Sequence, residues 1–270
     1  MSFSEALRAG RFPVALEITP PQRHLPAVLM RRASLLGAHT SAVNVIQRPD
    51  RQPSLEACLH LKGSGLGPAW HLVTRGREQG SLDADIASAA EGHLDLVLVI
   101  RGDHESPDAP AGLTIRQVTQ VVSRALPGAL VGATLNQYQP DQAAVFRNLL
   151  PKLSAGAGYV QTQPVFDTSA FATAAERLRR ESPATFIVPM VMPLPTVEAA
   201  DRISSRLGVA IPEVIRAAGD PWLAFQETLA TLHASGLADA IAIMTFEMDP
   251  PPETGRLITN ALQNAGILAP

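Results

Sequence analysis

The chain has 270 residues, of which 46% are apolar, and a formal net charge of −3 at neutral pH. This length allows two small domains or one large α/β domain, and the negative charge argues against a nucleic-acid partner, which would select a basic surface. Cys58 is the only cysteine, which excludes a disulfide framework and any multi-cysteine metal or iron–sulfur site within the chain.

The sequence also predicts the compartment. The first residues contain no basic segment followed by an apolar one, so no signal peptide is predicted. No apolar run approaches the roughly 18 residues of a membrane span. The seven histidines include no pair at metal-ligand spacing. We therefore predict a cytoplasmic protein with no membrane partner and no metal.

Eight short apolar runs, rich in Val and Ile, predict strands that are buried on both faces. They cover residues 13–18, 42–46, 70–74, 95–100, 130–135, 159–163, 186–192 and 240–246. Stretches with helical spacing separate them, and the longest interval, before the last run, holds extra helical material at 196–208, 211–219 and 221–236. This alternation predicts a single (β/α)8 barrel, a TIM barrel, over residues 1–270. A doubly wound open sheet is the alternative.

Polar residues gather where the predicted strands end, which is where a barrel builds its active site. They are Glu17, Asn44, Gln47, His71, Thr74, Arg75, Arg101, Asp103, Asn136, Gln161, Thr162, Gln163, Thr245 and Glu247. Polar groups on apolar strands are costly without partners, so one shared polar pocket explains them together. Gly102 would allow a sharp turn and the close approach of a ligand. The alternative interpretations are structural: a core histidine at His71, and an ion pair between Arg101 and Asp103.

The chain resembles a known enzyme family. The segments LEITPP, HLVTRGRE, VIRGDHES, GAGYVQTQPVFD, VPMVMPL and AIAIMTF occur in the order seen in methylenetetrahydrofolate reductases. The resemblance runs from about residue 13 to residue 260 and is closest to the short, stand-alone bacterial branch. It implies a (β/α)8 barrel that holds a flavin across its top and reduces 5,10-methylenetetrahydrofolate to 5-methyltetrahydrofolate with NADH or NADPH. FAD is the implied flavin, with FMN as the alternative.

The same resemblance implies roles for individual residues. Glu17 matches the catalytic glutamate, and Asp103 and Gln163 match residues that bind the folate. The residues implied as flavin contacts are His71, Thr74, Arg101, Gly102, Asp103, Asn136 and Lys152. The chain departs from the family pattern mainly on the flavin side, at Ile46, Val73, Gly76, Glu78, Leu135 and Gln139.

The expected chemistry gives Glu17 a definite task. Opening the ring that joins N5 and N10 requires a proton at N10, and a glutamate buried under a bound ring system can have its pKa raised enough to supply it. Two alternatives stay open: direct hydride transfer from the nicotinamide without a flavin, and a folate- or flavin-binding subunit that needs a partner chain for electrons. A homo-oligomer is compatible with either. A Schiff-base lyase is disfavoured, because Lys62 and Lys152 are the only lysines and neither ends a strand.

Overall fold

Eight parallel strands form a closed barrel, in which each strand pairs with the next along the chain and the last pairs with the first. The computed structural model describes residues 1–102 and 113–269. The strands are β1 Val14–Ile18, β2 Ala42–Val45, β3 Pro68–Val73, β4 Leu96–Ile100, β5 Leu130–Leu135, β6 Tyr159–Pro164, β7 Phe186–Val191 and β8 Ile241–Met244. The predicted (β/α)8 barrel is confirmed, and the predicted strands agree with the observed ones to within about two residues at each end.

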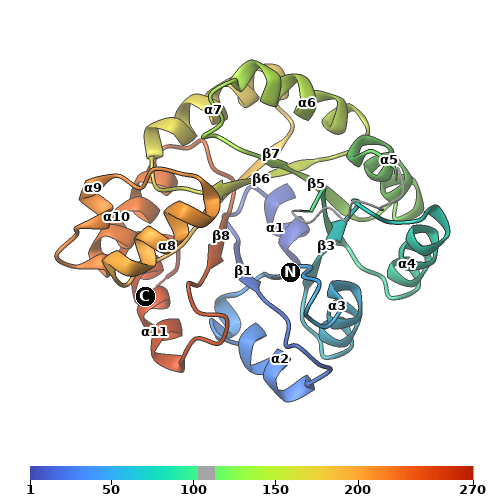
Figure 1. The fold of residues 1–270 in the computed structure, drawn as a ribbon, viewed down its shortest axis with the longest axis horizontal. Helices are drawn as coiled ribbons and strands as arrows, with labels where there is room; N and C mark the ends of the chain where they lie inside the picture. Colours follow the sequence, from blue (N-terminus) through green and yellow to red (C-terminus); the bar gives the residue numbers. More distant parts are fainter. Residues whose placement is uncertain (103–112, 270) are drawn as a thin grey trace.

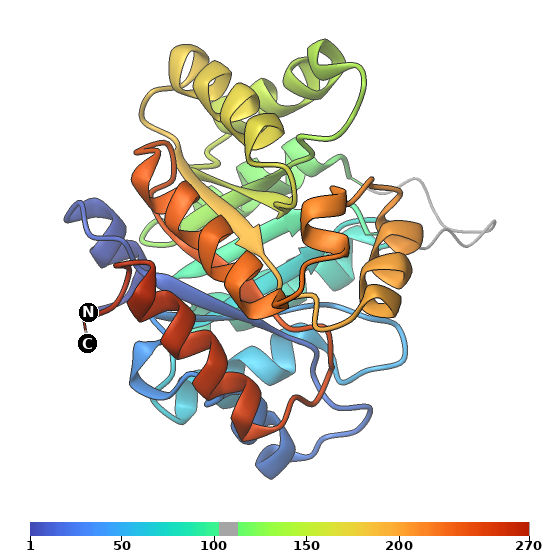
Figure 2. The same cartoon turned by 90° about the vertical axis from the view of Figure 1, so that its left-hand side faces the viewer.

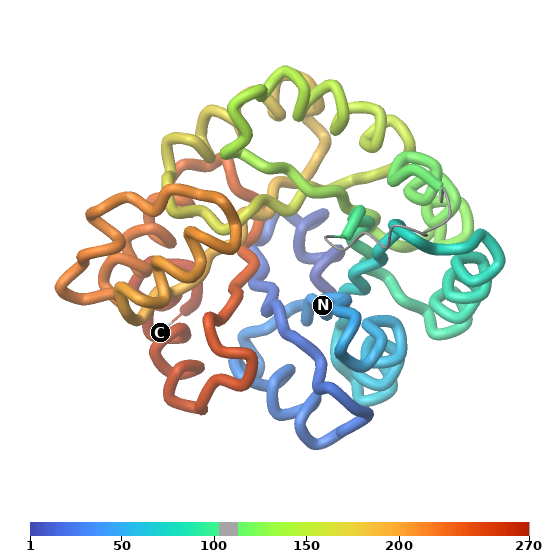
Figure 3. The backbone as a smooth tube through the Cα atoms, in the orientation of Figure 1, coloured from blue at the N-terminus to red at the C-terminus, as the bar shows by residue number. Residues whose placement is uncertain are grey.

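Helices surround the barrel as an outer ring (Figure 1). They are α2 Pro26–Ala33, α3 Ser54–Gly63, α4 Gln79–Glu91, α5 Ile115–Ala125, α6 Gln142–Ser154, α7 Thr168–Glu181, α10 Pro221–Ala234 and α11 Pro252–Asn264, with a short 3-10 helix, η1 Gly37–His39, after α2. The backbone trace shows the chain circling the barrel once, in sequence order (Figure 3). Outward-facing strand residues such as Leu16 and Val45 join helix residues such as Leu29 in the largest buried apolar cluster.

The barrel interior is a separate apolar cluster, built from small side chains on some strands and large ones on others. Ala15, Ala42 and Ala69 leave room for Leu98 and Tyr159. The Tyr159 ring fills the space beside Gly132, where an added Cβ would lie 2.3 Å from two ring carbons. The interior is therefore packed with side chains, as in other barrels of this kind, and any ligand must bind at an end.

A short helix, α1 Phe3–Arg8, covers the end of the barrel where the strands begin, and the sequence analysis did not predict it. Phe3 and Leu7 pack into the interior cluster. The helix starts with a capping box between Ser2 and Glu5, a local signal that is readable in the sequence. The opposite end, where the strands terminate, is called the mouth below.

The predicted extra helices between β7 and β8 are present as α8 Val197–Leu207 and α9 Glu213–Arg216, followed by α10. In Figure 2, α8 and α9 lie toward the mouth, at the opposite end of the molecule from α1. Phe166 and Met192, from the loops after β6 and β7, pack with Ile203 of α8 in a third apolar cluster. The insertion is therefore anchored to the strand ends. Within the described residues, no helix is long and apolar enough to cross a membrane.

Candidate active site

Four polar side chains meet inside the barrel just below the mouth: Glu17, Asn44, His71 and Gln161. Glu17 and Asn44 are paired in register on β1 and β2. The Gln161 amide connects them, because its Nε2 donates to Glu17 Oε2 over 3.0 Å and its Oε1 accepts from Asn44 Nδ2 over 2.9 Å. All four side chains are buried. The structure thus brings together residues from four strands that the sequence assigned to one shared polar pocket.

Burial gives Glu17 an unusual protonation state. Desolvation raises the pKa of the Glu17 carboxyl from 4.5 to about 7, while the Gln161 hydrogen bond and the charge of Arg206 oppose this effect. A carboxylic acid with this pKa is partly protonated at neutral pH and can donate a proton to a ligand.

His71 lies beside Glu17 but titrates in the opposite direction. Its Nε2 is 4.0 Å from Glu17 Oε2, and burial lowers the pKa of the imidazole to about 4. His71 is therefore neutral at pH 7, and the contact is not an ion pair. Its Nε2 is also buried with no hydrogen-bond partner among the described residues. A buried polar atom without a partner costs free energy, so this nitrogen is suited to contact a ligand.

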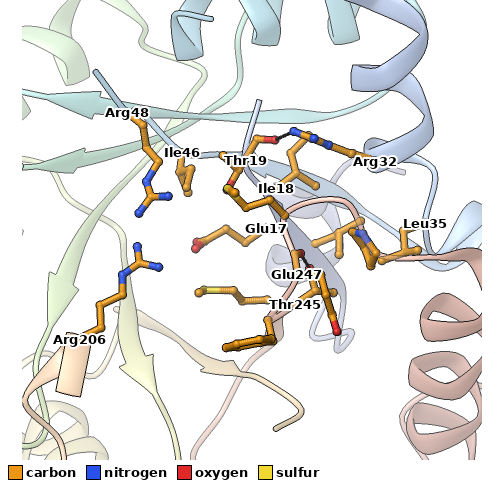
Figure 4. A pocket seen from close by; sticks show the side chains of 15 residues that line it. Glu17, Ile18, Thr19, Arg32, Leu35, Ile46, Arg48, Arg206, Thr245 and Glu247 are labelled. Atoms are coloured by element: carbon orange, nitrogen blue, oxygen red, sulfur yellow. Dashed lines mark hydrogen bonds between the residues drawn. The ribbon is translucent and has the colours of Figure 1, made fainter. Parts of the chain in front are cut away.

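A pocket opens above Glu17 on the β1, β2 and β8 side of the mouth (Figure 4). Its free space is about 520 Å³, which includes space open to solvent. Ile46 and Met244 contribute apolar wall. Arg48 and Arg206 extend from opposite sides toward the Glu17 carboxyl (Figure 4). The sequence analysis did not single out either arginine: Arg48 lies beyond the end of β2, and Arg206 lies on α8, so neither is a strand-end residue.

Arg32 and Asp249 fix the outer wall of the pocket. Arg32 Nη1 donates to the carbonyl oxygen of Thr19 over 2.7 Å, and its Nε lies 3.4 Å from Asp249 Oδ1. This pair connects α2 to the loops that follow β1 and β8. Arg32 therefore has a structural task.

The model of the methylenetetrahydrofolate reductase family matches residues 2–227, which is most of the chain. The chain belongs to the methylenetetrahydrofolate reductase family. A comparison with curated proteins finds no match.

One solved structure with a similar fold is an uncharacterized protein from Clostridium thermocellum that binds two copies of 5-methyl-5,6,7,8-tetrahydrofolic acid. It superimposes with a TM-score of 0.71 at 12% sequence identity, and the match covers 98% of this chain and 99% of the other. At this identity the likeness shows the fold alone.

In this member of the reductase family, one of the two residues expected to bind folate lies on a described strand. Asp103 lies outside the described residues. Gln163 lies on β6, two residues after Gln161. The pairing of β6 with β7 shifts register between Gln161 and Pro164, and the Gln137 side chain bonds both the N–H and the carbonyl of Gln163. An irregularity of this kind re-aims a side chain, and the Gln163 amide has no partner in the described part of the chain.

Three of the residues predicted as flavin contacts lie at the ends of β3 and β4. Thr74 is buried, and its N–H continues the β3–β4 pairing through the carbonyl of Ile100. Arg101 is exposed after β4. Gly102 has a φ of +90°, and an added Cβ would lie 2.6 Å from Val73 Cγ1. A side chain at this position would therefore meet Val73, and the approach of a ligand to the Gly102 backbone stays a prediction.

Two further residues predicted as flavin contacts are Asn136 and Lys152. Asn136 Oδ1 accepts from the N–H of Tyr138, which is a local turn interaction. Lys152 lies in the last turn of α6, the helix that leads back to the start of β6. The structure therefore does not bring Lys152 to the residues around Glu17. Across residues 1–102 and 113–269, no group of His, Cys, Asp and Glu side chains is arranged to hold a metal ion.

Proposed function

We infer that this chain catalyses the reaction of its family, the reduction of 5,10-methylenetetrahydrofolate to 5-methyltetrahydrofolate with a hydride from NADH or NADPH. The observation that carries this proposal is the buried Glu17 carboxyl, with a pKa of about 7, at the mouth of a barrel from that family. The reaction consumes one hydride and one proton. The chain must therefore hold a proton donor beside the folate, and Glu17 is placed to be that donor.

The proposed proton transfer begins with the folate above Glu17. Glu17 gives its proton to N10, the bond from N10 to the methylene carbon breaks, and the hydride adds to the resulting iminium carbon at N5. Gln161 keeps an N–H on Glu17 Oε2, which stabilises the carboxylate left after transfer. Asn44 orients the Gln161 amide so that its NH₂ end faces Glu17. His71 stays neutral and does not compete for the proton.

Recognition of the pterin is assigned to Gln163, with Asp103 as the second predicted partner. An aminopyrimidine ring offers donors and acceptors in one plane, and an amide can bond two of them at once. The Gln163 side chain fits this role because it has no partner in the described part of the chain while its backbone is held by Gln137.

A flavin fits the described residues only in part. The unpartnered His71 Nε2 suits a polar ring edge, but Val73 fills the space beside Gly102, and Asn136 is engaged in its own turn. A bound FAD or FMN would supply a store for the hydride between nicotinamide and folate. In the second candidate, the nicotinamide delivers its hydride directly to the folate.

Product analysis tests the proposal. Purified protein is incubated with 5,10-methylenetetrahydrofolate and NADH or NADPH, without flavin, with FAD or with FMN, and 5-methyltetrahydrofolate is measured by mass spectrometry. We expect product with at least one nicotinamide. Product formed by colourless protein without added flavin would indicate direct hydride transfer from the nicotinamide. Yellow protein that is bleached by the nicotinamide would indicate hydride transfer through a bound flavin. No product under any of these conditions would reject the proposed reaction.

A further inference from the structure

Two arginines flank the reactive carboxyl in a way that the proton transfer does not require. Arg48 and Arg206 enter the pocket from opposite walls and converge beside Glu17 (Figure 4). Arg206 is near enough for its charge to lower the pKa of Glu17. Both guanidinium groups therefore face the same pocket as the acid, and a positive charge beside a carboxyl lowers its pKa.

Arg48 is held in place through its backbone. Its carbonyl accepts from Gln47 Nε2 and from the N–H of Arg51, both over 3.3 Å. Gln47 Oε1 in turn accepts from the N–H of Ser54 at the start of α3. The guanidinium of Arg48 itself has no hydrogen-bond or ion-pair partner among residues 1–102 and 113–269. Its backbone is therefore fixed while its charged group is presented to the pocket.

Arg206 is positioned by α8. Thr196 caps the start of this helix. One turn before Arg206, the guanidinium of Arg202 lies 5.3 Å from the ring centre of Phe246, which also lines the pocket. Residues four apart share a helix face, so this cation–π contact turns the same face, with Arg206, toward the pocket.

We propose that Arg48 and Arg206 form an oxyanion subsite that binds a carboxylate or phosphate of the ligand whose reacting part lies over Glu17. Guanidinium groups bind these oxyanions through paired, charge-assisted hydrogen bonds. The identity of the anion rests on the proposed function, whose two ligands offer two sources: the glutamate carboxylates of the folate and the phosphates of the nicotinamide dinucleotide. The subsite would hold one of them at the pocket rim while the reactive ring reaches Glu17.

Equilibrium binding tests this without depending on turnover. Wild type, Arg48→Gln and Arg206→Gln are titrated with 5-methyltetrahydrofolate, with the pteroate analogue that lacks glutamate, and with NADH and NADPH. Arg8→Gln, with the same charge change on α1 at the far end of the barrel, is the matched control. Each pocket variant should weaken one class of anionic ligand about tenfold, with no effect of Arg8→Gln.

The ligand that weakens identifies the source of the anion. A loss for 5-methyltetrahydrofolate but not for its pteroate analogue assigns the subsite to the glutamate, and a loss confined to the dinucleotides assigns it to a phosphate. Unchanged affinity for all four ligands in both variants overturns the proposal.

If wild type binds none of these ligands, the proposed function fails. The oxyanion subsite is then tested separately by titrating wild type and both variants with inorganic pyrophosphate. Pyrophosphate binding that is lost in the variants keeps the subsite, whereas no pyrophosphate binding by wild type rejects it. Arg206 is exposed, so Arg206→Gln gives an answer even if Arg48→Gln does not fold.

Discussion

Burial shifts the pKa values of Glu17 and His71 in opposite directions. Glu17 and His71 face each other over 4.0 Å, and desolvation penalises the charged form of each. The same physical effect therefore raises the pKa of the carboxyl and lowers the pKa of the imidazole. Such a divergence assigns the roles: the proton available near pH 7 is on Glu17.

Gln161 is a positioning residue that influences the pKa of the Glu17 carboxyl. If Glu17 must be protonated for the reaction, kcat/KM falls as the pH rises through the pKa of Glu17. The Gln161 hydrogen bond lowers this pKa, so Gln161→Leu should raise it and shift the fall in kcat/KM to higher pH. Asn44→Leu removes the contact that orients the Gln161 amide but leaves Gln161 itself, so it should shift the pH dependence of kcat/KM less. Steady-state pH profiles of both variants measure the difference. An unshifted profile in Gln161→Leu would mean that the amide serves only the packing of the barrel.

Gln163→Ala tests recognition of the pterin. The loss of hydrogen bonds to a bound ring should cost about 1–3 kcal/mol, or roughly 5- to 150-fold in the Kd for 5-methyltetrahydrofolate. Thermal stability should change little, because the side chain has no partner in the described part of the chain. Gln120→Ala, at an exposed site on α5, is the control. Wild-type affinity in Gln163→Ala would remove this residue from the folate site.

At the level of elements, the packing inside the barrel depends on one glycine. An alanine at Gly132 would bring a Cβ within 2.3 Å of the Tyr159 ring, so Gly132→Ala should destabilise the fold by about 1–3 kcal/mol. Gly128→Ala adds the same methyl group where no atom lies within 4 Å and should be nearly neutral. Denaturant unfolding of both variants measures the difference. Equal stabilities would show that the ring moves aside without cost.

The elements also explain what the sequence could predict. Continuous apolar runs mark strands buried on both faces, and residues at the carboxyl ends of parallel strands must meet, so the grouping of Glu17, Asn44, His71 and Gln161 follows from topology. The positions of Arg48 and Arg206 depend on the path of a loop and the rotation of α8, which no strand periodicity encodes. The positive φ of Gly102 agrees with the sharp turn predicted there, and its role toward a ligand stays a prediction.

For the whole molecule, the two buried groups make stability depend on pH in opposite directions. The raised pKa of Glu17 stabilises the fold fully below pH 4.5, and this contribution is lost as the pH rises through about 7. The lowered pKa of His71 stabilises the fold above pH 6.5, and this contribution is lost as the pH falls through about 4. In the wild type the two trends offset each other over the same range.

Removing either group should expose the trend of the other. Glu17→Gln should become more stable as the pH rises from 4 to 6.5, and His71→Asn should become less stable from pH 4.5 to 7. Each change should be about 3 kcal/mol. Urea unfolding at intervals across this range measures it. Profiles that run parallel to the wild type in both variants would contradict the assigned pKa shifts.

The role of Glu17 in the reaction is tested most directly by kcat/KM for 5,10-methylenetetrahydrofolate as a function of pH, in wild type and in Glu17→Gln. The wild-type value should fall about tenfold per pH unit above about pH 7, where Glu17 loses its proton. Glu17→Gln keeps the shape of the side chain but cannot donate the proton, so its kcat/KM should be lower by about 10²–10⁴-fold and independent of pH in this range. Near-wild-type turnover in Glu17→Gln, with the same decline above pH 7, would contradict the assignment of Glu17 as the proton donor.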